Sequence, residues 1–130
     1  MKVYFKSEFF KITYLQDINI IASAWTTPPS SEEFRQGMEH LLHAIQHFKT
    51  GKLISDTTYM GAIFPEDQEW AATDWYQRAA AAGFSHNAII VPHDIFTELS
   101  VETILDRVDK RMIRAFFDNE NAAMEWIRQF

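Results

Sequence analysis

The first quarter of the chain alternates apolar and polar residues with the two-residue period of β-strands. Residues 9–15 (FFKITYL) and residues 18–25 (INIIASAW) both show this period, and only the two residues QD separate them. Two such runs joined by a short polar turn predict an antiparallel hairpin. The apolar triplet VYF near the N-terminus predicts an additional short edge strand.

The remainder of the chain alternates between helical and strand patterns. A helix is expected over residues 31–49, because Ser30 or Ser31 can cap its N-terminus and Gly51 can end it. The further elements expected are a strand at 52–56, a helix at 65–82 closed by Gly83, a buried strand at 86–91, a loop at 92–99, a helix at 101–110 capped by Ser100, a strand at 111–117 and a helix at 119–130. A hairpin followed by strand–helix units predicts one α/β domain over residues 1–130, with a mixed sheet of about five strands and about four helices.

Three segments carry a resemblance to a known family. KLISD (52–56) is a strand ending in Asp, MGAIFPEDQEWAATDWYQRAAAAGF (60–84) leads into a helix, and RAFFDNENAAMEWI (114–127) joins a basic-apolar strand, an Asp and an Ala/Glu-rich helix. In these segments and in element order the chain resembles the SpoIIAA-like (STAS-related) family, in particular an uncharacterised bacterial branch. The resemblance extends over nearly the whole chain. It implies a non-catalytic regulatory or protein-interaction domain.

In STAS antagonists of anti-sigma factors, the resemblance would imply a phosphorylatable serine at the start of the helix that follows an Asp-terminated strand. When Asp56 is aligned with that Asp, Phe64 and Pro65 fall at the positions where the family has an Asp followed by the acceptor Ser. The only hydroxyls nearby belong to Thr57 and Thr58, which come earlier, at the strand end. The acidic run EDQE that follows Pro65 also repels a second anion at this helix start. We therefore expect a domain without the phospho-acceptor.

Composition and charge exclude several classes of function. The chain has no cysteine, which excludes disulfides, thiolate metal sites and cysteine nucleophiles. A net charge of −6 disfavours nucleic acid and anionic membranes as partners. No apolar run approaches the roughly 20 residues of a membrane span, and the N-terminus lacks the apolar core of a signal peptide. A cytoplasmic protein without a membrane span or a cofactor is the expectation.

One face of the helix expected at 31–49 is rich in histidine. His40, His43 and His47 are spaced i, i+3 and i+7, and they fall roughly opposite the apolar arc of that helix. Histidines at this spacing can bind a metal. An outward helix face, however, offers neither a pocket nor supporting hydrogen bonds. The expectation is a solvent-facing stripe without a metal, and a pH-sensitive subunit contact is the alternative.

Ligand sites in α/β proteins lie beyond the carboxyl ends of parallel strands, and two loops should meet there. Their residues form a candidate crevice for a small or lipid-like ligand: Asp56, Thr57, Thr58, Tyr59, Met60, Phe64, His93, Asp94 and Phe96. CRAL-TRIO lipid-carrier domains are distantly similar to STAS domains, which supports the lipid alternative. His93 with Asp56 could serve general acid–base catalysis. No G-x-S-x-G, G-x-x-x-x-G-K or G-x-G-x-x-G motif accompanies them, so an enzyme is not the expectation.

Trp70 is the candidate partner contact. On an ideal helix it points about 140° away from Trp75, towards polar neighbours. An exposed Trp on a polar face is a typical anchor for a protein partner or for self-association, and the alternative is a Trp covered by neighbouring elements. The leading expectation is thus a protein-interaction domain, with ligand binding in the crevice second and catalysis third.

Overall fold

The structure, a computed structural model, describes residues 1–108 and 110–130. Its centre is one six-stranded sheet whose strands lie side by side in chain order: β1 (Lys2–Lys6), β2 (Phe10–Leu15), β3 (Ile20–Trp25), β4 (Lys52–Asp56), β5 (His86–Ile90) and β6 (Ile113–Phe117). Strands β1 to β3 are antiparallel, and β3 to β6 are parallel. The mixed α/β fold is therefore confirmed, and the VYF triplet belongs to a complete edge strand.

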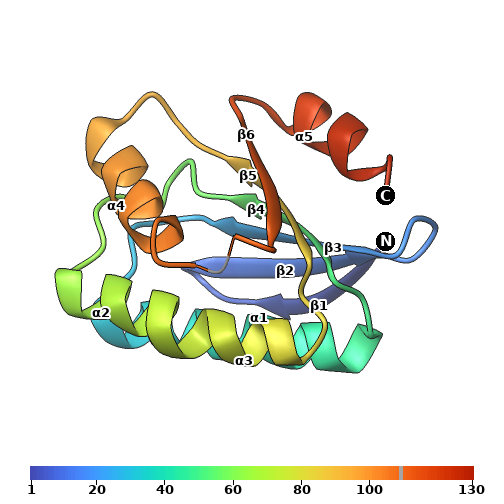
Figure 1. The fold of residues 1–130 in the computed structure, drawn as a ribbon, viewed down its shortest axis with the longest axis horizontal. Coiled ribbons are helices and arrows are strands. Elements are labelled where there is room, and N and C mark those ends of the chain that lie inside the picture. The colour runs from blue at the N-terminus through green and yellow to red at the C-terminus, as the bar shows by residue number, and fades with distance from the viewer. Residues whose placement is uncertain (109) are drawn as a thin grey trace.

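Helices cover both faces of this sheet (Figure 1). They are α1 (Ser31–Phe48), α2 (Pro65–Trp70), the π-helical segment η1 (Ala71–Trp75), α3 (Tyr76–Ala81), α4 (Ile95–Leu105) and α5 (Glu120–Ile127). One face packs against α1, the continuous α2–η1–α3 helix and α4, and it holds the larger apolar core. Helix α5 alone covers β4, β5 and β6 on the other face, over a smaller core.

Helix α1 begins where the sequence predicts it and ends earlier than expected. Ser30 Oγ accepts from the Glu33 amide (3.2 Å), and the Ser30 amide donates to Glu33 Oε1 (2.9 Å), which together form a capping box. At the other end Lys49, not Gly51, adopts the left-handed backbone conformation that ends the helix. Gly51 has a different role, because a Cβ there would lie 2.0 Å from the Gly83 carbonyl oxygen. Gly51 thus permits a close approach of two backbone segments.

The helix predicted over residues 65–82 is not a regular α-helix. Its middle, η1, is π-helical, and the Tyr76 amide donates to the Ala71 carbonyl five residues earlier. Within η1 the Trp75 indole donates to the Met38 carbonyl of α1 (2.6 Å). The Ala-rich sequence favours an α-helix and contains no Gly or Pro that would mark the wider turn. Local propensity therefore does not explain the π-helical turn, which lies where the helix contacts α1 and the sheet.

Helix α4 begins earlier than the sequence predicts. Asp94 is its N-cap and accepts from the Phe96 amide (3.2 Å) and the Thr97 hydroxyl (2.8 Å), so the expected loop at 92–99 is largely helical. Ser100 is an interior residue of α4 and not a cap. Its hydroxyl accepts from the Ile63 amide (2.9 Å), which ties α4 to the loop before α2. The helix ends at Leu105, and position 109 of the helix expected at 101–110 lies outside the described residues.

Candidate functional site

The residues of the predicted crevice do not line a common pocket. Asp56 points to the α5 side of the sheet, because side chains alternate along β4 and Ser55 faces the opposite side. Its carboxylate accepts from the amide (3.0 Å) and the hydroxyl (2.5 Å) of Thr58. Thr57 is buried, and its hydroxyl and amide both donate to the Ile90 carbonyl (2.7 and 2.9 Å). The strand end is therefore held by local hydrogen bonds.

The second predicted loop contributes no catalytic pair. His93 is exposed and forms no hydrogen bond or ion pair with a residue that the structure describes. Asp94 is occupied as the N-cap of α4. Among the described residues, His93 and Asp56 therefore do not form the hydrogen-bonded pair that acid–base chemistry would need.

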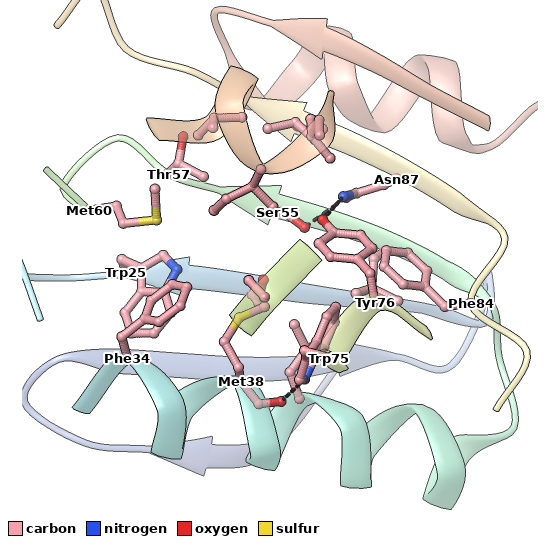
Figure 2. Close-up of a pocket in the computed structure, with 18 of the residues that line it drawn as sticks. Trp25, Phe34, Met38, Ser55, Thr57, Met60, Trp75, Tyr76, Phe84 and Asn87 are labelled. Atoms are coloured by element: carbon pink, nitrogen blue, oxygen red, sulfur yellow. Dashed lines mark hydrogen bonds between the residues drawn. The ribbon is translucent and has the colours of Figure 1, made fainter. Parts of the chain in front are cut away.

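A cavity of about 60 Å³ lies between the sheet and its helices (Figure 2). Thr57 and Met60 are its only members from the predicted crevice. Its walls are mainly aromatic and aliphatic, and the labelled residues of Figure 2 are Trp25, Phe34, Met38, Ser55, Thr57, Met60, Trp75, Tyr76, Phe84 and Asn87. Ala71 and Trp75 of η1 border it, and π-helical turns are frequent at functional sites.

Polar side chains cross the floor of this cavity in a row, which we call the polar row: Ser55, Asn87 and Tyr76. The Ser55 hydroxyl donates to Asn87 Oδ1 (2.7 Å), and Asn87 Nδ2 donates to the Tyr76 hydroxyl (3.3 Å). Burial raises the pKa of Tyr76 to about 12, while the Arg114 charge and the Asn87 hydrogen bond act in the opposite direction. The phenol is therefore protonated at neutral pH. Its O–H has no acceptor among the described residues, so it is a spare donor.

The cavity is small for a ligand site. It is well below the roughly 150 Å³ of an apolar cavity that admits benzene. Among the residues that the structure describes, its lining includes no Lys, Arg, His, Asp or Glu side chain, so a charged occupant would lose its hydration without an ionic partner. Polar residues at inward positions of apolar strands, such as Ser55 in KLISD and Asn87 in HNAIIV, were the sequence signal for this row.

Large apolar side chains are exposed at the carboxyl end of the sheet, and we call this group the edge patch. Its members, between 52% and 67% exposed, are Tyr59, Phe64, Ile95, Phe96 and Leu99. The first two lie in the loop between β4 and α2, and the other three share the outward side of α4, opposite buried Val101 and Ile104. The loop, the start of α2 and α4 occupy the same end of the molecule (Figure 1). Three of these residues, Tyr59, Phe64 and Phe96, were predicted for a crevice and instead face solvent.

The sequence does contain a signal for the edge patch. Monomeric proteins scatter single apolar residues over their surface but rarely gather large ones. In IFTELSVETIL, apolar residues occur on all sides of α4 and not in one arc. A helix that is apolar all round normally has cover on all sides. The outward side of α4 lacks such cover among the described residues.

Trp70 is not the exposed anchor that the helical wheel predicts. Its ring is half-buried, packs edge-on against Phe34 (6.3 Å between centroids) and lies under the Arg35 guanidinium (4.9 Å). The nearby Asp67 is buried and accepts from Arg35 Nε and Ser31 Oγ (both 2.9 Å). Helix α1 thus covers the Trp70 face, and the alternative of a Trp covered by a neighbouring element describes its position.

The histidine stripe is only partly solvent-facing. His43 and His47 are exposed, although the His47 ring lies 5.6 Å from Tyr4, whereas the half-buried His40 ring stacks on Phe5 of the edge strand (3.9 Å between centroids). Desolvation, and then the charge of His43, lower the pKa of His40. Among residues 1–108 and 110–130 no group of three or more potential His, Asp or Glu ligands could hold a metal. The absence of a bound metal in solution stays a prediction.

Comparison of the chain with protein-family models, with curated proteins and with solved structures finds no match. Within the described part of the chain, no helix is long and apolar enough to cross a lipid bilayer. The structure thus defines the class of protein as a mixed α/β domain with an exposed edge patch. The SpoIIAA-like resemblance stays a prediction.

Proposed function

We propose that this chain is a non-catalytic, STAS-like protein-interaction domain of the cytoplasm, and that the edge patch is its contact surface. The observation that carries the proposal is the exposure of five large apolar side chains at one end of the sheet. Leaving them in water forgoes roughly 1.5–3 kcal/mol for each side chain that a partner could bury fully. A partner that covers the patch recovers part of this free energy.

Two further observations support a contact surface over a reaction centre. His93 and Asp56, the only acid–base pair that the sequence offered at this end, are separated, and Asp56 faces the α5 side. In the STAS-like alignment, Pro65 falls at the acceptor serine, and the preceding Phe64 is itself a member of the edge patch. The resemblance thus places an aromatic side chain directly beside the position at which STAS antagonists carry their phosphorylation switch.

A photo-crosslinking experiment in cells of the source organism tests the proposal. A photoreactive phenylalanine analogue replaces Phe96 in one protein and Val3 in the control protein; Val3 is exposed on the distant edge strand β1. We expect a discrete protein adduct from position 96 that Leu99→Ser abolishes, and none from position 3. Equal adducts from both positions, or no adduct from position 96, would refute the edge patch as the contact surface.

A second candidate function is binding of a small neutral molecule in the cavity, and the spare Tyr76 donor at the polar row favours it. Acetone and isopropanol are suitable probes, since each pairs a short apolar body with one acceptor. We expect either probe to raise the melting temperature of the wild type but not of Tyr76→Phe, which lacks the spare donor. Identical shifts in the two proteins would contradict recognition by the polar row.

A further inference from the structure

The elements that carry the edge patch have fixed charges of one sign, and the neighbouring Arg35 of α1 is paired with Asp67 of α2 (2.9 Å). Between Lys52 and Arg107 the sequence contains a single Lys or Arg, Arg78. That residue lies away from the patch on α3 and is already paired with Glu39 and with Asp74 (2.8 Å). The elements that carry the patch therefore present carboxylates and no fixed positive charge.

Five exposed carboxylates lie on or at the ends of the helices next to the apolar members of the patch. Asp94, Glu98 and Glu102 belong to α4, and Glu66 and Glu69 belong to the start of α2. None of the five forms an ion pair with a residue that the structure describes. On α4, Glu98 and Glu102 flank the outward stripe of Ile95 and Leu99 on one side. The patch is thus an apolar centre with an acidic rim.

The acidic rim limits which kinds of partner could bind to the apolar patch. A second copy of the chain would place two acidic rims against each other, and like charges across an interface oppose association. An anionic lipid surface is repelled for the same reason. A partner with an apolar centre and a basic rim meets both features at once. Such charge complementarity speeds encounter and selects the partner.

Resting on the proposed function, we propose that the edge patch binds a basic amphipathic helical segment of a partner protein. The segment's apolar residues, spaced i, i+3 and i+4, pack along the outward stripe of α4 and against Phe64. Its Lys and Arg residues face Glu98 and Glu102 on one side and Glu66 on the other. Helix-on-helix docking suits this surface, because Ile95 and Leu99 form a ridge along one helix axis.

Three labelled peptides of equal length test this: a Leu/Lys amphipathic helix, a Leu/Glu helix with the same apolar pattern, and a Lys-rich scramble without an apolar face. Fluorescence anisotropy measures their binding to the intact protein. We expect only the Leu/Lys helix to bind, with affinity falling as salt rises. Phe96→Ser with Leu99→Ser, and separately Glu98→Lys with Glu102→Lys, should each weaken it about tenfold or more.

The matched control is Glu8→Lys with Glu125→Lys, which makes the same charge change at two exposed positions outside the patch. Its affinity should stay within about twofold of wild type, because neither position belongs to the edge patch and salt screens charges that make no direct contact. Equal weakening by the control would show a mere net-charge effect and overturn the proposal. Tighter binding of the Leu/Glu helix, lost on Phe96→Ser, would overturn the basic partner and leave the interaction function standing. If no peptide binds, the basic segment is refuted, and the crosslink at position 96 decides separately whether the interaction function falls with it.

Discussion

The hydrogen bond between Ser100 and Ile63 fixes α4 to the loop that carries Phe64, and its removal has a calculable cost. The Ile63 amide and the Ser100 side chain are both buried, and the N–H···O distance is 2.9 Å. Ser100→Ala leaves that amide without an acceptor, which costs about 1–3 kcal/mol for a buried donor. With about 2 kcal/mol lost, the melting temperature should fall by roughly 6–10 °C in a domain of this size.

Ser100→Gly separates the observed structure from the N-cap position that the sequence predicts. At an N-cap, Gly costs only a few tenths of a kcal/mol and is milder than Ala. In the interior of α4, Gly adds roughly 1 kcal/mol to the loss suffered by the Ala variant. We therefore expect Ser100→Gly to be the less stable of the two in urea denaturation. Thr103→Ala, on the exposed side of α4, serves as the control and should change stability by less than about 0.5 kcal/mol.

Hydrogen exchange reports on the same bond directly. The Ile63 amide should be protected in the wild type and exchange markedly faster in Ser100→Ala, with little change in the strands. If Ser100→Gly proves milder than Ser100→Ala, or if Ile63 exchange is unaltered, Ser100 does not hold the loop and the described position of α4 is wrong.

Three other perturbations probe how the helices are held. Asp67→Ala should cost about 2 kcal/mol in urea denaturation, below the roughly 3–5 kcal/mol of a fully buried pair, because Arg35 remains 43% exposed and can rehydrate; no loss would show that this pair does not join α1 to α2. Gly51→Ala should cost about 2 kcal/mol or more, since its Cβ meets the Gly83 carbonyl oxygen and backbone must move; a melting temperature equal to wild type would exclude that close approach. The pKa of His40 is lowered in the folded protein, so the fold favours the neutral imidazole. The free energy of unfolding is therefore unaffected by this group above a pH of about 6.5 and decreases as the pH falls below that value. His40→Gln should flatten the dependence of stability on pH below about pH 6.5, and an unchanged slope would contradict burial of that ring.

Hydrophobic periodicity and residues typical of turns and helix ends were sufficient to predict most of the helices and strands. The two-residue period of β2 and β3 and the cap at Ser30 are local signals, and the structure uses both of them. The order of the strands follows from short connections between successive elements. Local signals therefore predict elements well where local and tertiary preferences agree.

The misplaced features have tertiary causes. Both Asp94 and Ser100 are good N-cap residues, and only the contact between Ser100 and Ile63 shows that Ser100 lies inside the helix. The helical wheel put Trp70 on a polar face, but it ignores α1, whose Arg35 covers the ring. The π-helical segment has no local signal at all. The sequence predicted the correct end of the sheet for loop residues such as Tyr59, but it did not predict that their side chains face solvent instead of lining one pocket.

The most direct test of the interaction surface is an NMR titration of the isotope-labelled protein with the Leu/Lys helix. We expect the amide shifts to concentrate in residues 57–66 and 94–103, and to vanish in the protein carrying Phe96→Ser and Leu99→Ser. Shifts spread evenly over the acidic surface, or centred on the α5 side of the sheet, would contradict the edge patch as the binding surface.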